Sequence, residues 1–463
     1  MTRRSAGSGA PGALRVLLLN WRDSGHPEGG GAETFLERMA SGLRRHGHDV
    51  TVRVAAYPGA EREETVDGVR YLRRGGRFTV YARSAVHLAR HGRDVDVVVD
   101  VQNGMPFWTP LFTRRPVVNV THHLHREQWQ VVFGRTAGRL GWWLESRVAP
   151  RVYRRCRYLT VSGATREDLV RLGVSPERVG VVYSGIDAPV VPVDADAWPR
   201  SPEPSLVVLG RTVPHKRVEL ALATLAELRR ELPTASLTVI GHGYHEAALR
   251  AEAQRLGVAG AVDFRGWVDD VTKHRLLARA WVHVMPSVKE GWGLAVVESA
   301  AHGTPTVAFR SAGGTGESVR DGETGLLVND ETGFTVAVRR LLTDAELREH
   351  LGHGARVHAT KYTWAAAVDQ FETELRAVAG LPRRRMAPGP DLVGRADLGR
   401  ADLGRADLGR ADLGRADLGR ADLGRADLGR ADPEIGLGAG VDLMDVDAPE
   451  GGEVRPPAAA AGQ

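Results

Sequence analysis

The sequence has little cysteine and no long apolar run. Cys156 is its only cysteine, so the chain cannot form an internal disulfide. No stretch reaches the roughly 18 uninterrupted apolar residues that a membrane-spanning helix needs, because Arg, Asp or Gly breaks every candidate. The first residues also lack the basic start and apolar run of a secretory signal peptide. We therefore expect a cytoplasmic protein, with any membrane contact being peripheral.

Lysine is also scarce, and the charge is unevenly distributed. Of the 62 basic residues, 58 are arginine and 4 are lysine, against 57 Asp plus Glu. Residues 381–463 hold 12 Arg, no Lys and 15 Asp plus Glu, a net charge of −3, which leaves +8 for residues 1–380. A basic body suits nucleic acid, anionic lipid or phosphorylated small molecules, and the sign alone does not choose among them.

Between residues 14 and 380, short runs of Val, Leu and Ile alternate with amphipathic stretches of helical length. This alternation is typical of a parallel sheet with crossover helices. Prolines and isolated charges at residues 187–204 predict a linker, and residues 362–379 predict a last helix. Strands are expected at residues 14–20, 50–55, 95–101, 117–120, 158–161, 179–183, 206–209, 237–240, 262–264, 282–285, 306–308 and 326–328. The pattern predicts an α/β protein with two facing, doubly wound domains.

The C-terminal tail contains eight near-identical pentapeptides at residues 394–433, seven Gly-Arg-Ala-Asp-Leu and one Gly-Arg-Ala-Asp-Pro. In another frame, Ala-Asp-Leu-x-x resembles the pentapeptide-repeat pattern that builds a square β-helix. However, this length gives only about two coils without caps, and every turn carries glycine. We therefore favour a disordered low-complexity tail over a β-helix.

In the first of the two predicted domains, two segments follow expected strands and carry candidate binding groups. Pro27-Glu-Gly-Gly-Gly-Ala-Glu33 precedes a helix, where glycines let the backbone approach a ligand and helix-start amides face an anion. A purely steric role for these glycines is the alternative. Thr121-His122-His123-Leu124-His125 follows another strand, at the sheet edge where ligands bind. A hydrogen bond to substrate is favoured there over a metal, because adjacent side chains diverge.

In the second predicted domain, two segments carry charged groups at strand ends. Gly210-Arg211-Thr-Val-Pro-His-Lys216-Arg217 places two cations beside a helix start, which suits a diphosphate, with a solvated basic loop as the alternative. Glu290-Gly-Trp-Gly-Leu-Ala-Val-Val-Glu298 follows the strand at residues 282–285. Its two carboxylates can hold hydroxyls of a sugar or ribose by charge-assisted hydrogen bonds. Helix-capping or surface glutamates are the alternative there.

At these residues the sequence resembles the family 4 retaining glycosyltransferases, which have the GT-B fold of two facing Rossmann-like domains. The resemblance covers about residues 14–379. Its marks, in order, are Gly30-Gly31-Ala32-Glu33, Gly47-His-Asp-Val50, Thr160-Val-Ser162, Asp187, Gly210-Arg211 with Lys216, Gly241-His-Gly243, the two glutamates eight apart, His302-Gly-Thr-Pro305 and Asp321-Gly-Glu-Thr-Gly325. It implies an acceptor-side domain at residues 13–190, a linker at 191–204, a donor-binding domain at 205–360, a helix crossing back to the first domain at 361–380 and the tail at 381–463.

The resemblance also implies a reaction. A hexosyl unit would pass with retention from a nucleotide-diphosphate sugar to a hydroxyl of a lipid-linked, glycan or small-molecule acceptor, with no metal, other cofactor or nucleic acid. The implied catalytic residues are Glu290, His123, Arg211 and Lys216, although the neighbouring His122 leaves the histidine register open. The implied donor-binding residues are Gly30, Gly31, Arg211, Lys216, Gly241, Gly243, Glu290, Gly291, Trp292, Gly293, Leu294 and Glu298. An NDP-sugar epimerase, a phosphorylase and a non-catalytic sugar-nucleotide binder remain alternatives.

Residues 135–157, which begin at Arg135 and end at Arg157, predict a long helix with seven arginines and two tryptophans, Trp142 and Trp143. Basic and aromatic residues together suit peripheral contact with an anionic membrane. An ordinary helix packed on the first domain, with a solvated basic face, is the alternative.

Overall fold

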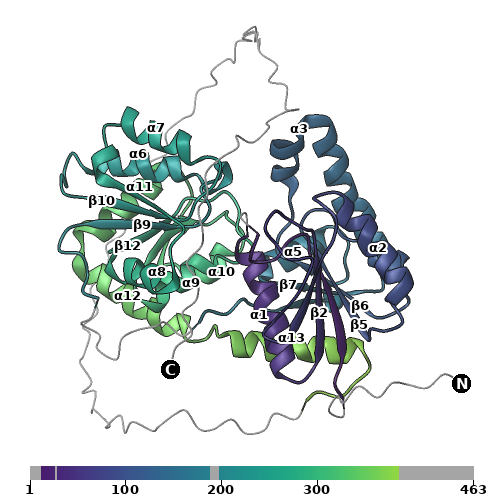
Figure 1. Cartoon of the computed structure of the whole chain (residues 1–463). Coiled ribbons are helices and arrows are strands. Elements are labelled where there is room, and N and C mark those ends of the chain that lie inside the picture. Colours follow the sequence, from purple (N-terminus) through teal and green to yellow (C-terminus); the bar gives the residue numbers. More distant parts are fainter. Residues whose placement is uncertain (1–11, 27–28, 188–197, 385–463) are drawn as a thin grey trace, which may run out of the picture. The chain divides into compact units, whose positions relative to one another are not determined.

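The computed structural model describes residues 12–26, 29–187 and 198–384, which form an α/β structure with two mostly parallel sheets (Figure 1). This confirms the predicted GT-B architecture. The predicted linker lies partly outside the described residues, and so does the repeat tail beyond residue 384. Among the described helices, none has the length and apolar content needed to cross a bilayer.

The first sheet has eight strands in the order β3-β4-β2-β1-β5-β6-β7-β8. Every neighbouring pair is parallel except β3 with β4. All six residues of the central strand β5 are buried, because helices cover both faces of such a sheet. The strands are β1 (Arg15–Leu19), β2 (Asp49–Val54), β3 (Glu63–Val66), β4 (Val69–Arg73), β5 (Val97–Gln102), β6 (Val117–Thr121), β7 (Arg157–Thr160) and β8 (Val179–Val181).

The hairpin of β3 and β4 was not among the predicted strands. Its turn residues, Asp67 and Gly68, have φ values of 50° and 76°, as a two-residue hairpin turn of type I′ requires. The Asp-Gly pair was therefore a usable signal. The strand β3 itself shows no apolar alternation, because it is an exposed edge strand with Glu63 and Glu64.

The second sheet has six parallel strands in the order β11-β10-β9-β12-β13-β14. Its strands are β9 (Ser205–Leu209), β10 (Ser236–Ile240), β11 (Val262–Gly266), β12 (Val282–Met285), β13 (Thr306–Phe309) and β14 (Gly325–Val328). The helices that connect these strands are α6 (Val218–Leu228), α7 (Glu246–Arg255), α8 (Asp270–Arg279), α9 (Leu294–Ala301) and α10 (Thr315–Ser318). Two further helices, α11 (Glu331–Thr343) and α12 (Ala345–Ala359), follow the last strand. All six strands predicted for the second domain are present, and their ends lie within two residues of the predicted ones.

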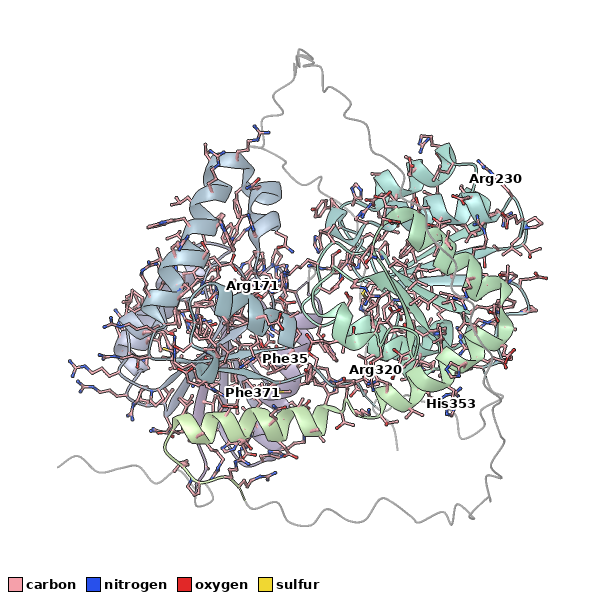
Figure 2. The ribbon with its side chains drawn as sticks, turned by 180° about the vertical axis from the view of Figure 1, so that it is seen from behind. Phe35, Arg171, Arg230, Arg320, His353 and Phe371 are labelled. Carbon is pink, nitrogen blue, oxygen red and sulfur yellow. The ribbon has the colours of Figure 1, made fainter. Side chains whose placement is uncertain are left out.

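The last helix, α13 (Trp364–Val378), packs against α1 (Gly31–Arg45) of the first domain. The rings of Phe35 on α1 and Phe371 on α13 lie 6.1 Å apart and nearly perpendicular (Figure 2). A Cβ on Gly42 would lie 2.3 Å from a methyl group of Val368, so only glycine allows the two helices this close. The chain thus returns to the first domain after completing the second.

The predicted helix at residues 135–157 needs a correction. Helix α3 (Arg126–Trp143) begins earlier and is broken at Gly134, where φ is 71° and ψ is −179°. It continues into a π-helical turn, Leu144–Val148, and α4 (Ala149–Val152), and Arg157 begins β7 instead. The first domain also contains α2 (Thr79–His91) and α5 (Gly163–Arg171).

Candidate active site

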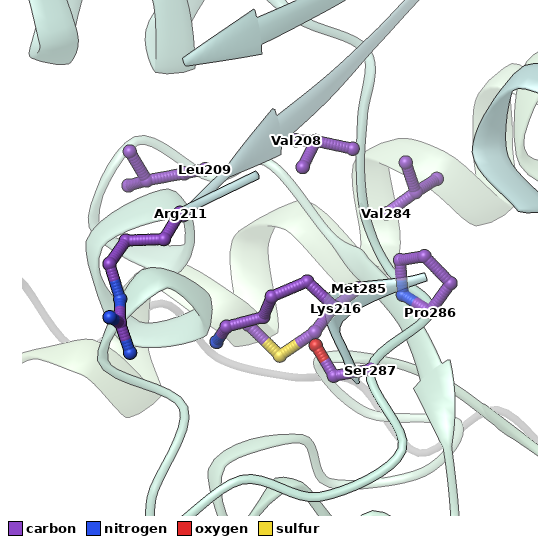
Figure 3. A pocket seen from close by; sticks show the side chains of 9 residues that line it. Val208, Leu209, Arg211, Lys216, Val284, Met285, Pro286 and Ser287 are labelled. Carbon is purple, nitrogen blue, oxygen red and sulfur yellow. The ribbon is translucent and has the colours of Figure 1, made fainter. Parts of the chain in front are cut away.

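A small pocket lies at the carboxyl ends of β9 and β12 (Figure 3). The strand order reverses there, since β9 pairs with β10 on one side and with β12 on the other. Open α/β sheets bind their ligands at such switch points. The lining residues are Val208, Leu209, Gly210, Arg211, Lys216, Val284, Met285, Pro286 and Ser287. The two predicted diphosphate ligands, Arg211 and Lys216, therefore border one cavity.

Lys216 and Glu290 form an ion pair at this pocket. The Lys216 Nζ lies 2.5 Å from the Glu290 Oε1, and the side chains are 21% and 12% exposed. Backbone hydrogen bonds from Glu290 N–H to Ala312 and from Gly314 N–H to Glu290 hold this loop against the next one. Burial raises the pKa of Glu290, but Lys216 and Ser287 outweigh that effect and lower it below the ordinary value. The carboxylate is therefore ionised and fixed in place.

Arg211 also lies close to the glycine loop of the first domain. A Cβ placed on Gly30 would sit 3.6 Å from the Arg211 Nε, whereas a Cβ on Gly31 would meet no atom within 4 Å. Gly30 is the N-cap of α1, and its N–H donates to the Glu33 carboxylate at 2.9 Å. Glu33 of the Gly-Gly-Ala-Glu motif thus stabilises the helix start. The arrangement brings the predicted residues Gly30 and Arg211 together.

Histidines from both domains surround the same charges. The rings of His123 and His125 stack at 4.3 Å. The pKa of His123 lies far below its ordinary value, mainly because the ring is buried. Smaller contributions come from His125, His122, His215 and Lys289. Burial, followed by Lys216, lowers the pKa of His215 to about 4, and Glu290 only partly opposes this. Both imidazoles are therefore neutral at pH 7, where they can donate or accept hydrogen bonds.

The second predicted carboxylate, Glu298 on α9, is also paired with a lysine. Its Oε1 lies 2.8 Å from the Lys273 Nζ of α8, and the side chains are 16% and 19% exposed. Burial raises the pKa of Glu298, and Lys273 only partly opposes this. Sequence reasoning identified Glu298 but missed its cation.

The predicted glycines of the second domain have clear packing reasons. A Cβ on Gly241 would lie 2.3 Å from the Gly210 carbonyl oxygen, and one on Gly243 would lie 2.4 Å from that of Thr212. A Cβ on Gly291 would lie 2.6 Å from the His122 carbonyl oxygen of the first domain. Gly293 has a φ of 90° and is the N-cap of α9, which begins at Leu294. These positions hold three loops in close contact around the pocket.

The ring of Trp292 lies in an aromatic cluster and not at the pocket, whose lining includes only Arg211 and Lys216 of the predicted donor-binding residues. Its side chain is 3% exposed and packs against Tyr183 and Tyr362, at ring distances of 4.6 and 4.9 Å. It does not line the pocket at β9 and β12. A direct role of its ring in donor binding remains only a prediction.

Sequence reasoning missed several polar residues that connect the domains. Lys289 forms an ion pair with Asp168 at 2.6 Å. Glu317 of α10 accepts hydrogen bonds from the Gly163 and Ala164 N–H groups at the start of α5, at 2.8 and 2.7 Å. The scarcity of lysine was a signal for part of this set, since three of the four lysines pair with Glu290, Glu298 and Asp168.

Comparison with known families agrees with this geometry. Residues 29–189 match the family model described as Glycosyltransferase Family 4, and residues 195–358 match that described as Glycosyl transferases group 1. The chain belongs to the family 4 glycosyltransferases. The model described as Pentapeptide repeats also matches residues 395–432, in eight copies. The family resemblance of the sequence is thereby confirmed.

Individual curated proteins match only part of the chain. The chain is 34% identical to a glycogen synthase of Mycobacterium tuberculosis over 210 residues, covering 44% of this chain and 50% of that protein. It is 35% identical to a D-inositol 3-phosphate glycosyltransferase of Acidothermus cellulolyticus over 231 residues, covering 46% and 51%. The chain thus spans about half the length of the curated relatives it matches.

Two solved structures are similar over most of the described chain. Sucrose-phosphate synthase from Thermosynechococcus elongatus has a TM-score of 0.68 at 21% identity, covering 79% of this chain and 99% of that one. The Anabaena protein HepE in complex with UDP-glucose has a TM-score of 0.62 at 18% identity, covering 79% and 100%. At these identities the likeness establishes the fold alone.

Proposed function

We propose that the protein is a retaining glycosyltransferase that moves a hexosyl unit from a nucleotide-diphosphate sugar to a hydroxyl acceptor. The observation that carries the proposal is the meeting of Arg211, Lys216 and Glu290 at the strand ends of the second domain, with Gly30 of the first domain beside Arg211. The HepE structures, which contain UDP or UDP-glucose, add support for this donor class.

In this proposal the main task of the protein is to stabilise the leaving diphosphate. Negative charge grows on the phosphate oxygens as the bond to the sugar breaks. Arg211 and Lys216 supply two cations that are fixed before the reaction begins. The start of α9, whose N-cap Gly293 offers no side-chain cap, adds a helix dipole with its positive end at the same loop.

The two glutamates would hold the two ends of the donor. Glu290 is ionised and fixed beside Lys216, so it can accept hydrogen bonds from the sugar hydroxyls. Glu298, held by Lys273, can accept from the ribose hydroxyls. The acceptor hydroxyl would attack from the same face and give its proton to the departing phosphate oxygen. The reaction then needs no strong protein base, and neutral His123 would serve as a hydrogen-bonding group.

A donor panel combined with three variants tests this function. We expect one of UDP-, GDP- or ADP-glucose to raise the melting temperature of the protein and to be hydrolysed or transferred to an added hydroxyl acceptor. Lys216→Met and Glu290→Gln should each lower turnover at least 100-fold, because each removes a group that acts at the diphosphate or sugar.

Lys361→Met is the matched control, since Lys361 is exposed and lies outside the pocket. It should keep wild-type turnover. Full turnover in Lys216→Met would refute the site assignment. Donor binding without any turnover would favour a non-catalytic binder. Product that forms only with added orthophosphate would indicate a phosphorylase.

A further inference from the structure

The segment at residues 126–155, which we call the arginine hairpin, has an unusual charge distribution. It comprises α3, the π-helical turn and α4, and the side chains of seven arginines in it are exposed. These are Arg126, Arg135, Arg139, Arg147, Arg151, Arg154 and Arg155. The one acidic side chain that the structure describes in this segment, Glu145, is only 1% exposed. The exposed charge described there is therefore entirely positive.

The hairpin has an inner side that is fully used for packing. The break at Gly134 turns the chain back, and a Cβ on Gly141 would lie 2.4 Å from the ring of Trp129. The Trp129 indole N–H and the His125 backbone N–H both donate to the Glu145 carboxylate, at 2.7 and 3.1 Å. Glu145 thus serves the hairpin itself and neutralises none of the outer arginines.

The outer side mixes cations with apolar groups. Arg135 and Arg139 are neighbours one turn apart on α3. Further along, Trp143, Arg147 and Arg151 border one hollow of the surface. Trp143 is 53% exposed and Leu140, beside Arg139, is 58% exposed. An open hollow of about 430 Å³ is lined by Trp143, Arg147, Val148 and Arg151. The outer side thus combines exposed cations with an exposed indole and an exposed leucine side chain, as faces that lie on a membrane surface do.

We propose that the arginine hairpin docks the protein on the surface of an anionic lipid bilayer. Guanidinium groups bind lipid phosphates by paired hydrogen bonds, and each basic side chain near an anionic surface adds attraction. Trp143 and Leu140 fit the boundary between headgroups and acyl chains, where an indole is favoured. RNA offers the same phosphates but no apolar layer for an exposed leucine.

The arginine hairpin adjoins the candidate site. Helix α3 begins directly after His123 and His125, at the first-domain side of the candidate site. A bilayer held on the hairpin would therefore lie near the first-domain edge of the candidate site. The docking itself does not require transfer activity, so the two proposals can fail independently.

Vesicle sedimentation of the full chain tests the docking. We expect binding to phosphatidylcholine vesicles with 30% phosphatidylglycerol, little binding to phosphatidylcholine alone, and weakening with added salt. Arg147→Glu/Arg151→Glu should reduce the binding at least tenfold, because two charges facing the lipid are reversed. Trp143→Ala should reduce it about threefold or more through lost burial of the ring. Arg147→Lys/Arg151→Lys should retain most of it.

The matched control is Arg275→Glu/Arg279→Glu, a pair of exposed arginines with the same four-residue spacing on α8. It should bind like the wild type, and circular dichroism should show that all variants are folded. Equal loss in both Glu pairs would mean that net charge alone matters, which would overturn the proposal. Unchanged binding of Arg147→Glu/Arg151→Glu, or tighter binding of a 20-nucleotide RNA than of the anionic vesicles at equal salt, would also overturn it.

Discussion

Replacement of Lys216 by methionine should destabilise the protein in a pH-dependent way. In the wild type, Lys216 keeps the pKa of Glu290 below its ordinary value, so this group contributes stability above about pH 4.3 and loses it only at lower pH. In Lys216→Met the carboxylate is still 88% shielded but has lost its cation, so burial raises its pKa. Stability is then lost as the pH rises above about 4.3, up to the new pKa.

The size of the loss follows from two limits. A carboxylate left ionised and unpaired in the protein costs about 3 to 5 kcal/mol. Taking up a proton instead costs at most about 1.4 kcal/mol for each pH unit above about 4.3, which is about 1 kcal/mol at pH 5 and about 4 kcal/mol at pH 7.5. We therefore expect Lys216→Met to lower the free energy of unfolding by about 1 kcal/mol at pH 5 and by about 3 kcal/mol at pH 7.5.

Urea unfolding of wild type and variant at both pH values measures this difference. Lys216→Met/Glu290→Gln should recover most of the loss at pH 7.5, because no unpaired charge remains. Lys361→Met should change stability little at either pH, since that side chain is exposed. An equal loss at pH 5 and 7.5, or a double variant as unstable as the single one, would refute the assigned ion pair.

Three further outcomes are expected. In thermal unfolding, Gly241→Ala should lower the free energy of unfolding by at least about 2 kcal/mol, since its Cβ would lie 2.3 Å from the Gly210 carbonyl oxygen. Gly257→Ala has no neighbour within 4 Å but a φ of 71°, so it should lower the free energy of unfolding by about 1 kcal/mol. Glu317→Ala should lose about 2 kcal/mol because two helix-start N–H groups lose their acceptor; the same melting temperature as the exposed control Glu323→Ala would contradict this. Hexosyl transfer should continue in EDTA, and loss of activity that Mg²⁺ or Mn²⁺ restores would contradict metal independence.

Much of the fold was predictable because the apolar runs of parallel strands are nearly continuous. All six strands of the second sheet were predicted, since burial on both faces leaves a signal that does not depend on partners. The exposed strand β3 was missed because its residues carry no such pattern. The end of the helix after Arg135 was also misplaced, because Pro150 is tolerated in the first turn of α4 and the arginines continue past Val152.

The candidate site was predictable only in part. Loop motifs indicated Arg211, Lys216 and Glu290, because each follows a strand end, where open α/β sheets bind their ligands. The partners Lys273 and Lys289 were not identified, since they come from segments that meet only in three dimensions. Likewise, nothing local to Trp292 indicates that its ring packs between Tyr183 and Tyr362.

The lysine distribution has a practical consequence for chemical labelling. Lys216, Lys273 and Lys289 are held by carboxylates and are only 19 to 27% exposed, whereas Lys361 is exposed. An amine-selective dye at low excess should therefore attach at Lys361, apart from the chain's α-amino group, and leave the Lys216 ammonium intact. That single handle suits surface immobilisation or a fluorescent reporter, without any need to engineer a cysteine.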